Sequence, residues 1–135
     1  MTQEEKNLLM NDLCMRLFTE TKIKIGEYSD YILVGINVSD DAPIKVQLVE
    51  DGTQYIIEAY PENARPYLRS MDSMTHEENI KYLTTCKYGN INFPTYESFI
   101  YLASIHIDFN DLISKGLAVK ASEDMYNLKN NHGID

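Results

Sequence analysis

The sequence predicts an α+β fold in which a small antiparallel sheet of four or five strands packs against three or four helices. Three observations lead to this prediction. Helical hydrophobic patterns occur near both ends of the chain, strand-like runs fill the region from residue 21 to 60, and no long polar linker divides the 135 residues. We therefore expect one globular domain over residues 1–125, followed by a mobile C-terminal tail over residues 126–135.

The first predicted element is a helix over about residues 3 to 18. Thr2 and Glu5 have the spacing of a capping box, and leucines recur at every fourth position from residue 9. Residues 21–25 then alternate polar and apolar side chains, which predicts a short strand. Its lysines are expected to face solvent at an edge of the sheet.

Three further strands are predicted over residues 31–38, 44–49 and 54–60. The first of these is apolar on both faces, which favours a strand covered on both sides. The dipeptide Asp51-Gly52 between the last two favours a tight turn. We therefore expect the last two strands to form an antiparallel hairpin.

The second half of the chain is predicted to be mainly helical. Two prolines make residues 61–74 a connecting loop, because proline donates no hydrogen bond and restricts the residue before it. A second capping-box spacing predicts a helix from Thr75, and a third helix begins at Thr95. A short fourth helix is expected over residues 108–115, followed by a last strand over residues 117–121.

Acidic side chains are concentrated in the predicted sheet. From residue 27 to 62 the chain has eight carboxylates and one cation, Lys45, which accounts for seven (8 − 1) of the nine net negative charges. We expect these carboxylates to cover one face of the sheet, where they repel polyanions and attract basic partners. This charge argues against binding of nucleic acid or of an anionic membrane.

The N-terminal residues lack the basic and apolar regions of a signal peptide, and no run approaches the roughly 18 apolar residues of a membrane span. A cytoplasmic location is therefore expected. In that setting the two cysteines, Cys14 and Cys86, are expected to be buried and reduced.

Motifs for catalysis, metal binding or cofactor binding are absent from the sequence, so no catalytic residue, metal or cofactor is predicted. His76 lies in the first turn of a predicted helix without the His-Glu-x-x-His spacing of zinc sites. His106 ends another helix, where the helix dipole favours a histidine cation. The acidic pairs Asp40-Asp41 and Glu50-Asp51 could bind a divalent ion if their turns met, but solvated turns are the commoner structure.

The segment from Arg65 to Arg69 is the predicted contact surface. It holds two of the chain's three arginines around a proline and a tyrosine, and arginine and tyrosine are enriched where proteins bind one another. The simpler interpretation is that these arginines pair with the acidic sheet. The candidate partner-binding residues are Arg65, Tyr67, Arg69, Asp40, Asp41, Glu50 and Asp51.

Two segments carry a resemblance to a known group of proteins. Residues 66–78 (PYLRSMDSMTHEE) and 108–126 (DFNDLISKGLAVKASEDMY) resemble small uncharacterised proteins encoded by phages and mobile elements of gut Bacteroides. The resemblance implies a cytosolic phage or prophage setting, and it implies no particular activity or catalytic residue.

These observations favour a non-enzymatic protein-binding module of phage or mobile-element origin, whose partner is a host or phage protein. One alternative is a small enzyme or metal-dependent ligand binder that uses His76 or His106 with nearby carboxylates. It requires a cleft in which a histidine meets a carboxylate. The other alternative is an oligomeric structural or assembly protein, in which tyrosines and a strand edge make homo-oligomer contacts.

Overall fold

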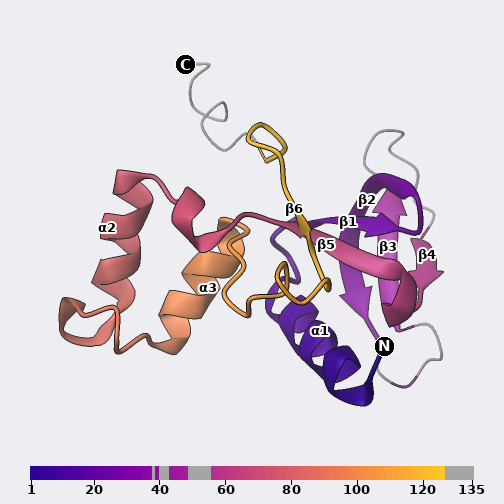
Figure 1. Ribbon diagram of the computed structural model, residues 1–135, viewed down its shortest axis with the longest axis horizontal. Coiled ribbons are helices and arrows are strands. Elements are labelled where there is room, and N and C mark those ends of the chain that lie inside the picture. The colour runs from indigo at the N-terminus through magenta and orange to yellow at the C-terminus, as the bar shows by residue number, and fades with distance from the viewer. Residues whose placement is uncertain (38, 40–42, 49–55, 127–135) are drawn as a thin grey trace.

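The computed structural model describes residues 1–37, 39, 43–48 and 56–126, and this part of the chain combines helices with one sheet (Figure 1). The α-helices are α1 (Gln3–Met15), α2 (His76–Thr85) and α3 (Tyr96–Ser104). The short 3-10 helices are η1 (Pro61–Asn63), η2 (Met71–Ser73) and η3 (Lys87–Gly89). In spatial order, the strands are β4 (Ile56–Ala59), β3 (Ile44–Leu48), β2 (Tyr28–Ile36), β1 (Lys22–Ile25), β5 (Ala64–Leu68) and β6 (Val119–Lys120).

This mixture of helices and strands confirms the predicted class, but the sheet is larger than predicted. The strands from β4 to β5 are antiparallel, and β6 adds a parallel strand beyond β5. β3 and β4 pair as predicted, with Lys45 opposite Glu58, whereas the turn predicted at Asp51-Gly52 lies outside the described residues.

The helices begin where their capping residues predict. At Thr2, Thr75 and Thr95 the hydroxyl accepts the amide hydrogen of the residue three positions later. The side chain of that later residue in turn accepts the threonine's own amide hydrogen, so two backbone donors are satisfied at each helix start. α1 ends at Met15, about one turn earlier than predicted.

β1 lies inside the sheet, so the edge position predicted for residues 21–25 is wrong. It pairs with β2 on one side and with β5 on the other. The loop predicted over residues 61–74 is also wrong, because β5 falls within it. Pro66 pairs with Ile23 of β1, but β6 begins to pair with β5 only at Tyr67, so no strand on that second side needs an amide hydrogen from Pro66.

A β-bulge determines which side chains of β2 face the core. The pairing of β2 with β3 shifts between Leu33 and Gly35, so one residue is inserted into the regular alternation. Leu33 is buried before the shift and Ile36 packs against the same core after it, whereas Val34 is exposed. The alternation of inward and outward side chains therefore holds on each side of the bulge but not across it.

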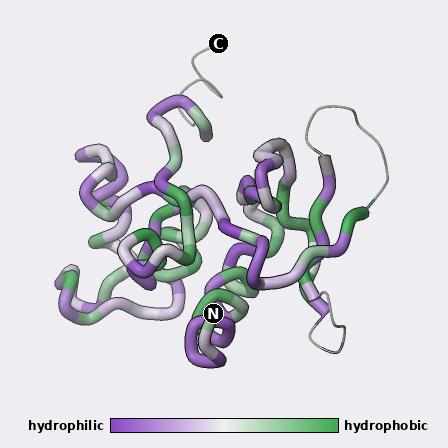
Figure 2. The backbone as a smooth tube through the Cα atoms, turned by 45° about the vertical axis from the view of Figure 1, so that its right-hand side comes forward, coloured by the Kyte–Doolittle hydropathy of each residue, from purple (hydrophilic) through white to green (hydrophobic). Residues whose placement is uncertain are grey.

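The buried hydrophobic residues form two clusters. The larger lies between α1, one face of the sheet and the segment around residues 112–118. The smaller lies between α2, α3 and the segment that follows α3, and it contains Tyr82, Cys86, Leu102 and Ile107. Figure 1 shows these parts side by side along the longest axis, and hydrophobic stretches (green in Figure 2) run through the strands and the middle of the molecule.

A buried ion pair joins the two parts. Arg16, at the end of α1, donates to both carboxylate oxygens of Asp12 at 2.7 and 3.1 Å, and both side chains are fully buried. The same guanidinium donates to the carbonyl of Ile107 at 2.8 Å and lies 4.6 Å from the ring centre of Phe109. α1 therefore contacts the smaller cluster through charge-assisted hydrogen bonds and ring stacking.

The fourth helix predicted over residues 108–115 is wrong, since this segment forms a series of turns. The Asp108 carboxylate accepts the amide hydrogens of Leu112 and Ile113, which gives the backbone an alternative to helical bonding. Asp111 has a left-handed backbone with φ of +56°, which a helix does not tolerate. The predicted last strand is present as β6.

The folded chain extends at least to Tyr126, one residue into the predicted mobile tail. The Tyr126 hydroxyl donates to the carbonyl of Tyr67 and accepts the amide hydrogen of Lys22, so this side chain is part of the packed structure. Residues 127–135 lie outside the described residues. Both cysteines are free thiols; Cys86 is buried as predicted, whereas Cys14 is exposed.

Candidate functional site

The most distinctive surface is formed by residues 87–96, which comprise η3, the loop after it and the first residue of α3, and which we call the hairpin tip. It lies at the end of the longest axis opposite to β4 (Figure 1). It displays four large apolar or aromatic side chains with high exposed fractions: Tyr88 (86%), Ile91 (59%), Phe93 (51%) and Tyr96 (70%). Exposed apolar side chains gathered on so short a segment are typical of a binding surface rather than of an ordinary solvated loop.

The backbone of the hairpin tip is closed by hydrogen bonds. The Lys87 amide donates to the Phe93 carbonyl at 2.8 Å, and the Phe93 amide donates to the Asn90 carbonyl at 2.9 Å. Tyr88 has a left-handed backbone with φ of +59°, an unfavourable conformation for a bulky side chain. These bonds therefore hold the tip in one shape, and that shape directs an aromatic ring into solvent.

The aromatic rings of the hairpin tip contact one another without being covered. The rings of Tyr88 and Phe93 meet edge to face, with their centres 6.4 Å apart. The Lys87 ammonium lies 5.8 Å from the centre of the Tyr88 ring, which suits a cation–π contact. A partner could therefore bury a preformed aromatic pair next to a positive charge.

A polar network beneath the tip fixes α2 relative to α3. The Thr95 hydroxyl donates to the Thr85 carbonyl at 2.8 Å, and the Thr85 hydroxyl donates to the Ser98 hydroxyl at 2.9 Å. Ser98 is fully buried and also donates to the Cys86 thiol. These bonds connect the last turn of α2 with the first turn of α3. They therefore hold the two ends of the hairpin tip in a fixed relative position before any partner binds.

The sequence pointed instead to Arg65, Tyr67 and Arg69, which the structure places in or next to β5. Tyr67 is buried, so it offers no contact surface. Arg65 donates to the carbonyls of Pro61, Ala64 and Gly116, and thereby ties the strand to its neighbouring turns. These three residues thus make internal contacts in the folded chain.

Arg69 connects β5 to α2 and to the end of α3. It forms a bidentate ion pair with Glu78 and also donates to the carbonyls of Ser73 and Ile105. Burial opposes ionisation of Glu78, but the hydrogen bonds from Arg69 and Thr75 hold the pKa of this carboxyl below its ordinary value. Within the described residues, Arg65 therefore contacts backbone carbonyls and Arg69 contacts carbonyls and the helix-capping Glu78, and neither pairs with a described carboxylate of the sheet.

The acidic candidates Asp40, Asp41, Glu50 and Asp51 lie outside the described residues. On the strands, the sheet face turned away from α1 carries more cations than carboxylates among the side chains that are described: Lys22, Lys24, Lys45 and Arg65 against Glu58. Glu58 pairs with Lys45, and Glu62 pairs with Lys6. The described strands therefore do not present an acidic face.

The histidines do not form a catalytic arrangement in the described part of the chain. His76 is exposed on the first turn of α2, and His132 lies outside the described residues. His106 is buried, and burial together with the charges of Arg16, Arg69 and Lys22 lowers its pKa to about 3. The cation predicted at this helix end is thus wrong, since desolvation and neighbouring positive charges outweigh the helix dipole.

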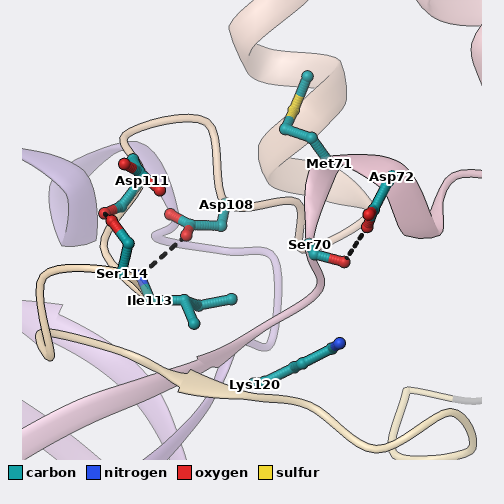
Figure 3. Close-up of a pocket in the computed structure, with 8 residues that line it drawn as sticks. All are labelled: Ser70, Met71, Asp72, Asp108, Asp111, Ile113, Ser114 and Lys120. Carbon is teal, nitrogen blue, oxygen red and sulfur yellow. Dashed lines mark hydrogen bonds between the residues drawn. The ribbon is translucent and has the colours of Figure 1, made fainter.

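An open cleft of about 410 Å³ lies between η2, the 108–114 turns and β6 (Figure 3). Its lining includes three aspartates but no histidine: Ser70, Met71, Asp72, Asp108, Asp111, Ile113, Ser114 and Lys120. As Figure 3 shows, Asp72 accepts from Ser70 and Asp108 accepts from the backbone of Ile113. Within residues 1–37, 39, 43–48 and 56–126, no group of three potential ligands is arranged to hold a metal ion.

Comparison of the chain with models of protein families, with curated proteins and with solved structures finds no match. Among the residues that the structure describes, no helix is long and apolar enough to cross a membrane.

The residues of the hairpin tip were not singled out from the sequence. They are interspersed with Gly89, asparagines and a proline, a composition typical of a solvated loop. The available signal was that four large apolar residues within nine positions follow neither helical nor strand periodicity, so no packed element accounts for them.

Proposed function

We propose that this chain is a non-enzymatic protein-binding module and that the hairpin tip is its contact surface. The observation that carries the proposal is the exposure of Tyr88, Ile91, Phe93 and Tyr96 on a loop closed by hydrogen bonds. Aromatic side chains contribute strongly to protein interfaces, and a rigid loop loses little conformational entropy on binding. The expected phage or mobile-element origin makes a host or phage protein in the cytoplasm the expected partner.

The test compares capture of partners by three forms of the chain. These are the wild type, the double variant Tyr88→Ser/Phe93→Ser, and the control Phe18→Ser, which removes an aromatic side chain that is 94% exposed outside the tip. Host lysate is passed over each immobilised form, and the recovered protein is identified and then titrated in purified form. Circular dichroism verifies that each variant is folded.

We expect the wild type and Phe18→Ser to bind the same partner, and the tip variant to bind it about tenfold or more weakly, since truncation of a central aromatic residue typically costs about 2 kcal/mol or more. Equal binding by all three forms would refute the tip as the contact surface. Loss of binding only in Phe18→Ser would show that the contact surface lies near Phe18, after the end of α1, and not at the hairpin tip.

A further inference from the structure

We infer that the hairpin tip binds a second copy of the same chain, tip to tip about a twofold axis. The inference rests on the proposed function, because it requires the tip to be a docking surface, and it adds that a second copy occupies this surface when no other protein is bound there. Three observations carry it: where the net charge lies, which charges flank the tip, and how the apolar side chains are displayed.

The distribution of charge favours the tip as the place where two copies can meet. The chain has a net charge of −9, and residues 27–62 account for seven of these charges, so most approaches of one copy to another are repulsive. The strands of that region, β2 to β4, lie at the end of the longest axis away from the hairpin tip (Figure 1). A tip-to-tip contact therefore places the strands β2 to β4 of the two copies at opposite ends of the pair.

The charges that flank the tip are complementary to each other. Lys87 begins the tip and Glu97 follows it, and no other charged residue lies between these two positions. Both are exposed, and within the described part of the chain neither forms an ion pair. Lys81, the next cation along the chain, lies over the Tyr101 ring on the body of the hairpin.

A twofold interface brings the same patch of both copies together, so that residue i contacts residue j and residue j contacts residue i. A patch with one cation and one carboxylate beside an apolar centre satisfies this requirement. Lys87 of each copy can then pair with Glu97 of the other, while Tyr88 and Phe93 bury their exposed surfaces against their counterparts. A separate protein would need an acidic and a basic group in the matching arrangement, whereas a second copy has them by symmetry.

The contact is small, because it involves one loop and the first turn of a helix. Interfaces at the lower end of the size range are weak, so we expect a dimer that dissociates on the order of micromolar concentration or above. Its formation should weaken with added salt, since exposed ion pairs are screened.

The test uses purified full-length protein and analytical ultracentrifugation over a range of concentrations. Four samples are compared: the wild type, Lys87→Glu, Glu97→Lys, and an equimolar mixture of these two variants. Each single variant places like charges opposite each other at two symmetric contacts, whereas the mixture restores two attractive pairs in every heterodimer. The variant Tyr88→Ser/Phe93→Ser serves as the apolar control.

We expect the wild type to dimerise, each single variant to have a dissociation constant about tenfold higher, and the mixture to recover wild-type association. The apolar control should remain monomeric. A wild type that is monomeric at all concentrations overturns the inference, and so does a dimer that the charge reversals do not weaken. If the protein is monomeric but the tip still captures another protein from lysate, the second copy is refuted while the proposed function stands. If the protein is monomeric and the tip captures no protein from lysate, both the second copy and the proposed function are refuted.

Discussion

His106 shows how local surroundings can reverse the ionisation that chain position alone favours. Its ring stacks on Tyr126, with ring centres 3.6 Å apart and planes 11° from parallel. Its Nδ1 atom is buried and has no hydrogen-bond partner within the described structure. A cation here would lose water without gaining an acceptor, and the charged groups that lower the pKa of the ring, Arg16, Arg69 and Lys22, are positive. The neutral imidazole is therefore the form that the fold requires.

The lowered pKa of His106 predicts a specific acid sensitivity. The pKa is about 3 in the folded state, against an ordinary value of 6.5 for an unperturbed histidine, so the unfolded chain binds a proton that the folded chain excludes. Stability is therefore fully present above pH 6.5 and falls as pH decreases toward 3, with a slope of about 1.4 kcal/mol per pH unit for one proton. Between pH 6.5 and about 5 this contribution can be separated from Glu5, Glu62 and Glu78, whose lowered pKa values affect stability only near and below 4.5.

The measurement is urea unfolding at several pH values in that window. The variant His106→Phe should lose the slope contributed by one proton, whatever its absolute stability, because the slope reports only proton binding. The control His76→Gln removes an exposed histidine and should leave the slope close to that of the wild type. If the wild type and His106→Phe have the same slope, His106 does not exclude a proton in the folded state.

At the scale of elements, Tyr126 completes the ladder between β1 and β5. Ile23 pairs with Pro66, so continuation of the antiparallel register would place Lys22 opposite Tyr67. The Tyr126 hydroxyl stands between them: it accepts the Lys22 amide at 2.9 Å and donates to the Tyr67 carbonyl at 2.6 Å. The phenol thus replaces one step of the ladder and satisfies a backbone donor and a backbone acceptor together.

We predict that Tyr126→Phe destabilises the fold by about 1–3 kcal/mol, because it leaves these two backbone groups without their partner in a half-buried place. The ring stacking on His106 is retained, so the loss measures the hydroxyl alone. Urea unfolding gives the value, and Tyr28→Phe is the matched control, since Tyr28 is 71% exposed. A change within about 0.5 kcal/mol for both variants would show that water replaces the hydroxyl without cost.

Elements whose signals are local could be predicted from the sequence. The starts of α2 and α3 follow from the hydroxyls of Thr75 and Thr95, and the pairing of β3 with β4 follows from two nearby strand-like runs. β5 could not be recognised, because both strands that pair with it are remote in the chain: β1 precedes it by about forty residues and β6 follows it by about fifty. The contacts of Arg65 and Arg69 likewise involve carbonyls and a carboxylate that only the folded chain brings near them.

The candidate site was harder to predict than the fold. The enrichment of arginine and tyrosine in protein interfaces favoured the arginines and the tyrosine in or next to β5 as contact residues. Whether these side chains are exposed depends on the order of the strands in the sheet, which could not be predicted from the sequence. The hairpin tip could be identified only from the exposed fractions of its side chains, because an apolar residue between glycine and asparagine can be either buried or exposed in a folded protein. Exposure is thus a property of the assembled elements, and local composition does not determine it.

At the scale of the whole molecule, the two hydrophobic clusters differ in size and should differ in stability. The larger cluster contains twelve buried residues and the smaller contains four, counted over the residues that the structure describes. Since burial of apolar surface is the main stabilising term, the part formed by α2 and α3 depends on its contacts with the rest of the chain. Asp12 and Arg16 provide such a contact through the Ile107 carbonyl and the Phe109 ring.

We therefore predict that native-state hydrogen exchange in low urea opens α2 and α3 before the sheet. The double variant Asp12→Leu/Arg16→Met removes the buried pair without leaving one charge alone, a change that is often nearly neutral for overall stability. In this variant, amides of α2 and α3 should exchange about tenfold faster, because the smaller cluster loses the charge-assisted hydrogen bond from Arg16 to the Ile107 carbonyl, worth about 1.5 kcal/mol or more, while amides of β1 to β3 should keep most of their protection. The control Lys6→Met removes an exposed ion pair with Glu62 and should not distinguish the two parts. Equal acceleration across helices and sheet in the double variant would mean that the molecule opens as one unit, and that the buried pair contributes to the whole fold rather than to the junction between its two clusters.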